Sequence, residues 1–412
     1  MIERKMRNRL FALMTMLLAL SAVMVGCHGA FPVSAEAADI RMADRWSGDT
    51  VKIGYLANLT GSGAYTDIPP KLALEDHIKE INARGGWLGK KVELVTYDAG
   101  RDALTESVTA VNKMIQQDKV IALVGPTGSR YALPIIQLCN ESKTPCITTG
   151  ATNAKVTVNE DTGKVNPYMF RVSFIDPYQG SVMANFAFND LGIKKLATIA
   201  GVDDLYAQGL IKYFTDEYKR LGGEIISALS YQLSDVEFRA QLSAIDDNGA
   251  EVIFSPCAEY KHASLIAKQA EQLGLEFTYL FTEGVYAPEL LETAGPQIEG
   301  AYITTPMTDD DPAYADYKKA FDERHKRTGY KANIYAYYSL DGIMLLEWAI
   351  MKANSFDGEA IKAALETAVD VPLFTEPFTI EPETHNPHNK SVTILRVEDS
   401  QFKPFKVFKP TD

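Results

Sequence analysis

Short apolar segments rich in β-branched residues alternate, along most of this chain, with longer stretches in which apolar residues recur with the helical period. Such alternation is typical of successive βαβ units, whose strands lie parallel in one sheet. The first predicted series has strands and helices, in chain order, at Val51–Asn58, Pro70–Ala83, Lys91–Asp98, Ala103–Gln117, Val120–Gly125, Ser129–Asn140 and Pro145–Thr149. We therefore predict an α/β fold built on mostly parallel, doubly wound sheets.

A second series of the same kind follows. Its predicted helices and strands, in chain order, are Gln179–Leu191, Lys195–Val202, Tyr206–Leu221, Glu224–Gln232, Val236–Asp246, Glu251–Pro256, Ala258–Leu273 and Thr278–Glu283. The rest of the chain has a segment Ala301–Pro306, helices at Ala313–Arg327, Tyr335–Ala353 and Gly358–Ala368, and short strands at Phe378–Ile380, Val392–Val397 and Phe402–Phe408. A chain of 412 residues is longer than one hydrophobic core usually supports, and an apolar content of 46% is enough to form two cores. We therefore predict two lobes. The first comprises residues 50–172 and 305–373, and the second comprises 173–304 and 374–412.

The N-terminal segment has the pattern of a secretory signal peptide. Basic residues precede an apolar run, Leu10–Val25, that is short for a membrane anchor. Two processing routes are open. Cleavage after Ala37 removes residues 1–37, whereas cleavage before Cys27 leaves a cysteine that can carry a lipid. We expect a periplasmic or otherwise extracytoplasmic protein, with or without a lipid anchor.

The charge of the mature chain excludes one class of partner. Removing residues 1–37 takes away four basic and two acidic side chains, so the net charge of −13 becomes −15 over the remaining 375 residues. Nucleic acids are therefore not expected to bind, because phosphate recognition needs the opposite sign.

The cysteines and histidines do not show the spacing of a metal site. Cys139 and Cys146 flank a short polar turn, and either a disulfide or two buried thiols is consistent with that spacing. Cys257 is expected to be a lone thiol. A cluster of Glu381, Glu383, His385 and His388 lies among prolines that indicate a surface turn. We expect no bound metal and no cofactor.

Three glycine-bearing loops follow predicted strands of the first series. They are Leu59–Thr66, Gly125–Ser129 and Thr148–Asn153. Ligands of doubly wound sheets bind at the carboxyl ends of the strands, and small residues there leave backbone amides free for an anion. Each loop by itself can also be a capping turn, but three on one sheet edge favour a binding site.

These loops and two later segments resemble, in their order, the leucine/isoleucine/valine-binding family of ABC-transporter periplasmic proteins. The motifs that carry the resemblance are Gly61 to Ala64, Gly125-Pro126 with Ser129, Gly150-Ala151-Thr152, Phe170-Arg171 with Asp176 and Gln179-Gly180, and Glu283-Gly284. The resemblance extends from about Val51 to Phe405. It implies a type I periplasmic binding protein, or Venus flytrap, with three crossings between the lobes. It also implies no enzymatic activity and delivery of ligand to an ABC permease in the inner membrane, by a protein we expect to be monomeric.

The resemblance also assigns roles to residues. Ser129 and Thr152 look like the family's carboxylate-binding hydroxyls, with backbone groups of Gly150, Ala151 and Thr152 beside them. Glu283 matches the acidic residue that receives the ligand ammonium. Tyr206 matches a tyrosine that closes on the ligand, and Tyr335 one that walls the pocket. Tyr260 or its neighbour Glu259 falls near another contact, and Tyr65 of the first loop completes the predicted site.

Departures from the family pattern bear on the ligand. Thr127 and Gly128 stand where the branched-chain binder has bulkier residues, so we expect a roomier pocket and an α-amino acid larger or more polar than valine. Aromatic and long aliphatic amino acids are included, alongside leucine and isoleucine. The alternatives are another small polar acid or amide, ligand sensing for a membrane receptor, and a hydrolase. None of the six histidines belongs to an HExxH or Gly-x-Ser-x-Gly motif, which argues against the last.

Overall fold

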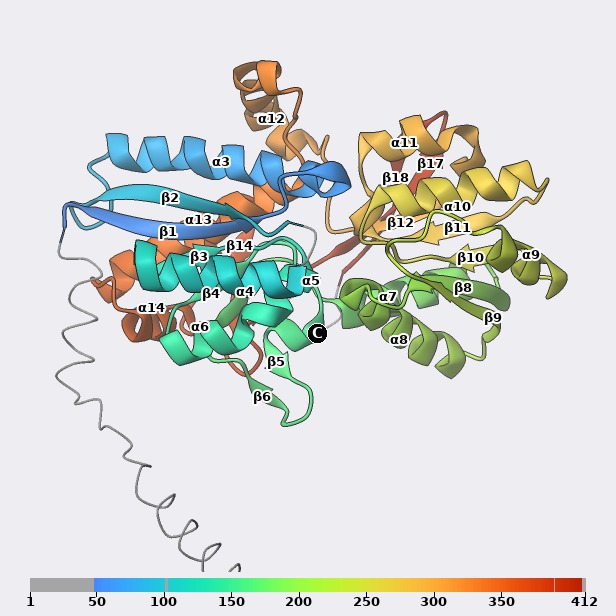
Figure 1. Cartoon of the computed structure of the whole chain (residues 1–412), viewed down its shortest axis with the longest axis horizontal. Coiled ribbons are helices and arrows are strands. Elements are labelled where there is room, and N and C mark those ends of the chain that lie inside the picture. Colours follow the sequence, from blue (N-terminus) through green and yellow to red (C-terminus); the bar gives the residue numbers. More distant parts are fainter. Residues whose placement is uncertain (1–47, 101–102, 389, 410–412) are drawn as a thin grey trace, which may run out of the picture. The chain divides into compact units, whose positions relative to one another are not determined.

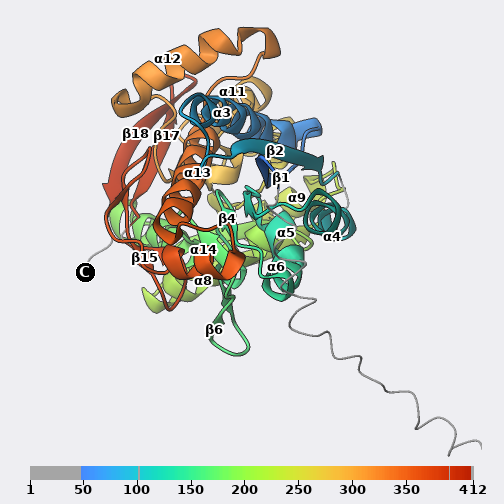
Figure 2. The same ribbon diagram turned by 90° about the vertical axis from the view of Figure 1, so that its left-hand side faces the viewer.

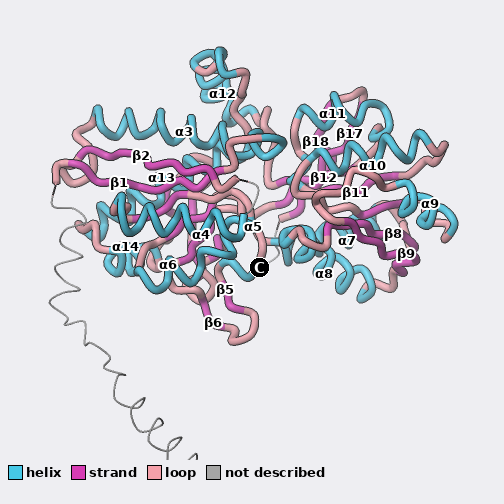
Figure 3. Tube along the Cα trace, in the orientation of Figure 1, coloured by secondary structure: helices cyan, strands magenta, loops and turns pink. Residues whose placement is uncertain are grey.

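Two open sheets form the framework of the structure, which is a computed structural model describing residues 48–100, 103–388 and 390–409. The predicted signal peptide, residues 1–37 with Cys27, lies outside the described residues. The strand orders are β2-β1-β3-β4-β7 in one sheet and β18-β17-β12-β11-β10-β8-β9 in the other. Both orders run outward from an early strand in two directions, so each sheet carries helices on both faces (Figures 1 and 3). The predicted α/β, mostly parallel fold is confirmed.

The first sheet is parallel throughout. Its strands are β1 (Thr50–Ala57), β2 (Lys91–Asp98), β3 (Ala122–Val124), β4 (Cys146–Thr148) and β7 (Met169–Arg171). On one face lie α4 (Ala103–Lys113), α5 (Ser129–Ala132) and α6 (Ile136–Ser142), and on the other lie α3 (Ala64–Ala83) and α13 (Ile334–Ala353). Two further helices, α12 (Ala315–Arg324) and α14 (Gly358–Leu365), pack beside α13 (Figure 2). These elements form the first lobe.

The second sheet has five parallel strands and an antiparallel pair at one edge. Its strands are β8 (Lys195–Gly201), β9 (Glu224–Tyr231), β10 (Val252–Phe254), β11 (Thr278–Phe281), β12 (Tyr302–Thr305), β17 (Val392–Glu398) and β18 (Gln401–Phe408). One face packs on α9 (Arg239–Asp247), α10 (Tyr260–Gln272) and α11 (Pro288–Ala294), and the other on α7 (Asp176–Asn185) and α8 (Leu205–Arg220). The remaining strands form two-residue hairpins: β5 (Val158–Asn159), β6 (Lys164–Val165), β13 (Val371–Pro372), β14 (Pro377–Phe378), β15 (Ile380–Glu381) and β16 (Asn386–Pro387).

Most predicted strands and helices appear at their expected places, and the differences have local causes. The predicted helix Ser129–Asn140 is divided by a 3₁₀ turn, Leu133–Ile135, at a proline that cannot donate an amide hydrogen bond. Helix α3 starts earlier than predicted and continues through Pro69. Pro69 has no N–H, so it cannot donate the helical hydrogen bond to the Tyr65 carbonyl four residues earlier. The Asn333 side chain donates to that carbonyl instead, at 2.9 Å, and the helix continues.

The third crossing between the lobes lies later than the predicted boundary after residue 373. The segment up to β16 stays on the first lobe, where Thr157 donates to the Asn386 side chain at 2.9 Å and His385 stacks on Phe170 at 4.1 Å between ring centroids. The chain therefore crosses to the second lobe after β16 and before β17. The predicted boundary was too early because β14, β15 and β16, which follow residue 373, pair in local hairpins instead of joining the second sheet.

Within the described ranges, none of the helices combines the length and the apolar character that crossing a membrane requires.

Candidate functional site

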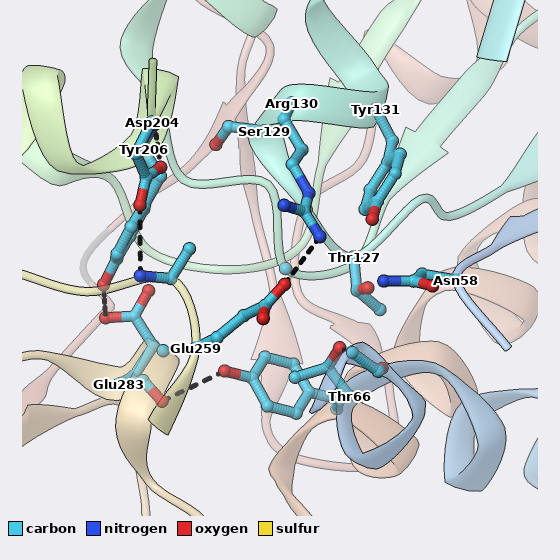
Figure 4. A pocket seen from close by; sticks show the side chains of 16 residues that line it. Asn58, Thr66, Thr127, Ser129, Arg130, Tyr131, Asp204, Tyr206, Glu259 and Glu283 are labelled. Atoms are coloured by element: carbon cyan, nitrogen blue, oxygen red, sulfur yellow. Dashed lines mark hydrogen bonds and ion pairs between the residues drawn. The ribbon is translucent and has the colours of Figure 1, made fainter. Parts of the chain in front are cut away.

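A cavity of about 60 Å³ lies between the two lobes, at the carboxyl ends of strands from both sheets. The first lobe contributes the loops after β1, β3 and β4, including Asn58, Thr66, Thr127, Ser129, Arg130 and Gly150. The second lobe contributes the segments after β8, β10 and β11, including Asp204, Tyr206, Glu259 and Glu283 (Figure 4). Tyr335 of α13 completes the wall. This is the location that the topology of doubly wound sheets predicts for a ligand.

On the first-lobe side, the loops after β3 and β4 pack closely against each other. A hydrogen bond joins them, and a glycine leaves room for the close approach. Ser129 begins α5, and its hydroxyl oxygen accepts the backbone N–H of Asn153 at 3.2 Å. At Gly150, a Cβ atom would lie 2.8 Å from the Thr127 carbonyl oxygen and 3.2 Å from the Tyr335 ring. A larger residue there would push the two loops apart, so Gly150 permits the close packing of this wall.

The Thr127 side of this wall rests on a buried carboxylate. Asp67, which is 1% exposed, accepts hydrogen bonds from the Thr127 hydroxyl, from the Asn58 backbone N–H at 3.0 Å and from the Tyr55 hydroxyl at 3.2 Å. Burial raises the pKa of Asp67 to about 6, although these donors act in the opposite direction. The three donors fix the positions of the loops after β1 and β3.

On the second-lobe side, Glu283 follows β11 and is 4% exposed. Its carboxylate accepts hydrogen bonds from the Tyr206 hydroxyl at 2.8 Å and from the Gln179 amide, which also donates to Thr304 at 2.8 Å. Burial raises the pKa of Glu283 to about 7, and the hydrogen bonds only partly oppose this shift. The Tyr335 hydroxyl of the first lobe donates to the Glu283 carbonyl at 3.1 Å, so this wall contacts both lobes.

Asp204 lies next to this carboxylate but has a structural task. It is the N-cap of α8, where it accepts the backbone N–H groups of Tyr206 at 3.1 Å and Ala207 at 3.2 Å. It also accepts the Ala258 N–H at 3.2 Å, which ties the loop after β10 to the start of α8. Burial raises its pKa to about 6.

An ion pair joins the lobes across the cavity. Arg130 Nη2 of the first lobe lies 2.7 Å from Glu259 Oε1 of the second, and Figure 4 shows the two side chains meeting within the pocket. The sequence led us to expect a roomier side-chain pocket opposite Thr127 and Gly128. In the structure, Arg130 and Glu259 project into that space, which leaves the small volume given above.

Comparison with known proteins agrees with this architecture. Residues 50–401 match the model of the family described as periplasmic binding protein. The chain belongs to that family. The resemblance noted in the sequence is thus confirmed at family level.

Proteins similar to this periplasmic binding protein carry different ligand names. An amino acid binding protein of Pseudomonas aeruginosa is 30% identical over 309 residues, which cover 74% of this chain and 80% of that protein. The solved structure of a leucine binding protein, LivK, from Thermotoga maritima is 29% identical, with a TM-score of 0.78 over 87% of this chain and 99% of that one. A solute binding protein from R. palustris in complex with 4-hydroxybenzoate shares the fold, with a TM-score of 0.75 at 22% identity over 87% and 97% of the two chains.

Five of the nine residues predicted for the site of this periplasmic binding protein line the cavity: Ser129, Gly150, Tyr206, Glu283 and Tyr335. The other four lie nearby but outside the lining.

Ala151 and Thr152 are buried behind the wall, where the Thr152 carbonyl accepts a hydrogen bond from Arg171 at 2.6 Å. Tyr260 begins α10 and faces an outer groove of about 720 Å³. The Tyr65 hydroxyl donates to Asp309 at 3.2 Å.

Sequence reasoning missed Arg130, Tyr131 and Asp204 and named Glu259 only as an alternative to Tyr260. The structure places Glu259, and not Tyr260, in the lining. Arg130 directly follows Ser129 in a loop that had been singled out, so its charge was the available signal. The sequence does not show that the Arg130 side chain points into the cavity, because its direction depends on the backbone geometry at the start of α5.

The three cysteines within the described part of the chain are free thiols. Cys139 and Cys146 are both free and buried, and Cys146 Sγ lies 3.2 Å from the Gly125 carbonyl oxygen. The neighbouring Cys139 thiol, together with burial, raises the pKa of Cys146. Cys257, also free, lies 3.4 Å from the Tyr231 hydroxyl.

The histidines that the sequence placed in a turn are occupied by other contacts. His385 is buried, with Nδ1 3.0 Å from the Met169 carbonyl oxygen and Nε2 3.2 Å from Glu366. His388 Nδ1 lies 3.2 Å from Glu381. The two rings therefore belong to separate hydrogen-bonded contacts.

Proposed function

We propose that this protein is the extracytoplasmic solute-binding component of an ABC importer and that it captures a small α-amino acid in the cleft. The observation that carries this proposal is the arrangement of the cavity walls. Ser129 and the small residues around Gly150 lie on one lobe, and Glu283 and Tyr206 face them from the other. A zwitterion fits between a wall of polar donors and a carboxylate, because each of its charges meets its complement.

The same arrangement supports binding instead of catalysis. The described residues that line the cavity include neither a histidine nor a cysteine, and the Ser129 oxygen accepts a hydrogen bond from a backbone amide. A serine nucleophile would need a base within hydrogen-bonding distance. We infer that the ligand is enclosed, carried and released unchanged.

The test of this function is calorimetric titration with the twenty protein amino acids. We expect at least one to bind, and we expect Glu283→Gln to weaken that binding by roughly 30-fold or more, since losing a buried charge partner costs about 2–5 kcal/mol. Glu292→Gln, on the exposed surface of α11, is the matched control and should leave affinity unchanged. Absence of binding by all twenty amino acids would contradict the proposal.

The proposal includes export and a membrane partner. We infer that residues 1–37, or the segment before Cys27, direct the chain across the inner membrane, where the loaded protein meets an ABC permease. Mass spectrometry of the mature N-terminus distinguishes Ala38 from a lipid-modified Cys27. Permease genes beside this gene favour import, whereas receptor genes favour the sensing alternative.

A small aromatic acid is the second candidate ligand. The rings of Tyr131, Tyr206 and Tyr335 all line the cavity, and aromatic walls bury a flat ligand with little loss of entropy. Burial raises the pKa of Glu283 to about 7, and below that pH the protonated carboxyl needs no ammonium partner. Including 4-hydroxybenzoate in the titration separates this candidate from the amino acids.

A further inference from the structure

The Arg130–Glu259 ion pair is the direct charge contact between the two walls of the cavity. Its two side chains are only 23% and 17% exposed, and Arg130 also stacks on Tyr131, with the guanidinium carbon 4.9 Å from the ring centroid. Arg130 therefore has a defined direction into the cavity that does not depend on Glu259 alone.

Glu259 stands at the boundary between two spaces. Both members of the pair line the inner cavity of about 60 Å³ and also the outer groove of about 720 Å³. Glu259 immediately precedes α10, and the outer groove beside it contains Lys261. If Glu259 turns away from Arg130, its carboxylate can enter this outer groove, where water and the Lys261 ammonium are available to it.

In the described part of the chain, the inner cavity is lined by three carboxylates, those of Asp204, Glu259 and Glu283, and by one guanidinium, that of Arg130. Asp204 is engaged by three backbone amides, and Glu283 by two neutral donors. Among the described residues that line the cavity, Arg130 is the one cation. An anionic group on a ligand finds its strongest complement there, because a guanidinium presents a planar fork that matches a carboxylate.

We propose that Arg130 receives the carboxylate of the bound ligand and that Glu259 occupies this position until the ligand displaces it. This inference rests on the proposed function only in placing the ligand in this cleft, and it applies equally to an amino acid and to an aromatic acid. In the liganded protein, the carboxylate lies between the Arg130 guanidinium and the Ser129 hydroxyl, and Glu259 points into the outer groove.

Two substitutions distinguish this role from that of a simple latch between the lobes. A latch would stabilise the closed form, so removing either partner would weaken ligand binding. If Glu259 competes with the ligand, Arg130→Gln weakens binding but Glu259→Gln strengthens it. The opposite signs are a property that a purely structural role does not produce.

The experiment titrates the wild-type protein with the twenty protein amino acids and 4-hydroxybenzoate. The carboxylate that binds most tightly, and its carboxamide counterpart (L-leucinamide for L-leucine), are then titrated into the variants. We expect Arg130→Gln to weaken carboxylate binding roughly 30-fold or more. We expect it to change carboxamide binding by less than about threefold, because the neutral amide forms no charge-assisted pair with Arg130. Glu259→Gln should tighten carboxylate binding about two- to fivefold, because a competing ion pair is removed.

The matched control is Glu237→Gln, which removes an exposed ion pair with Arg239 on the same lobe and should change nothing. Arg130→Gln with unchanged carboxylate affinity, or Glu259→Gln with weakened affinity, overturns the inference. Should Arg130→Gln not fold, the sign of the Glu259→Gln effect decides alone.

The possible failures are distinguishable. If amino acids bind but neither variant behaves as described, only the role of Arg130 fails. If 4-hydroxybenzoate binds and the amino acids do not, the proposed amino-acid function fails while Arg130 is still tested. A wild-type protein that binds none of these carboxylates overturns both.

Discussion

Single residues of the site were predictable from the sequence where their chemistry matches a loop position. Glu283 follows a strand and Gly150 follows another, and the structure brings both to one cavity. Thr152 sits in an equally suitable loop, yet its side chain is buried behind the wall. Whether a loop residue faces the ligand or the scaffold depends on backbone direction, which a single sequence does not reveal.

The raised pKa of Glu283 predicts that amino-acid affinity depends on pH. Burial moves this pKa to about 7, and an ammonium ligand needs the carboxylate form, so binding below that pH must release a proton. We expect affinity to fall roughly tenfold per pH unit below about 7 and to be flat above it. Calorimetry between pH 5.5 and 8.5, in buffers of different ionisation enthalpy, measures both the affinity and the protons released.

Neighbouring carboxyls do not remove this expectation. Asp176 faces Glu283 from α7, and burial raises its own pKa to about 8, so it is mostly protonated below about pH 7, where Glu283 titrates, and adds little negative charge there. Glu283→Gln is the control, since it should abolish the pH dependence together with the tight binding. A flat profile in the wild type would mean that the ligand ammonium does not meet Glu283.

At the level of elements, β-branched runs located the strands well, because a buried parallel strand needs them on both faces. The short elements α11 and β7, of seven and three residues, were missed, since so few residues show no period. The start of α3 was also missed. Its first turns depend on Asn333, a residue distant in sequence that serves the Tyr65 carbonyl.

Asn333 therefore provides a test of how these elements are joined. It is 1% exposed, its side chain oxygen accepts the Ala336 N–H at 3.0 Å as the N-cap of α13, and its amide serves α3. We expect Asn333→Ala to lower the free energy of unfolding by about 2 kcal/mol, through a lost cap and an unpaired carbonyl. Chemical denaturation measures the change.

The control is Asn248→Ala. This exposed residue follows α9, and its side chain makes a hydrogen bond only to Ala244 of its own helix, at 2.7 Å. It should cost less than about 0.5 kcal/mol, as surface substitutions usually do. Equal losses for the two variants would show that Asn333 does not couple α3 to α13.

At the scale of the whole described chain, the two-lobe organisation follows from two series of βαβ units, and the family comparison agrees with it. The lobes meet directly through Arg130 with Glu259, through Asn153 with the Leu205 carbonyl at 2.8 Å, and through Tyr335. We propose that the crossings after β7, after β12 and between β16 and β17 act as the hinge. The last could not be placed from sequence, because it is set by hairpins that pack on Phe170.

The most direct measurement is a crystal structure of the protein with its tightest-binding amino acid. We predict the ligand in the cavity between the lobes, with its ammonium group hydrogen-bonded to the Glu283 carboxylate and its carboxylate beside Ser129. A ligand bound elsewhere, or one in the cleft whose ammonium group lies away from Glu283, would contradict this account.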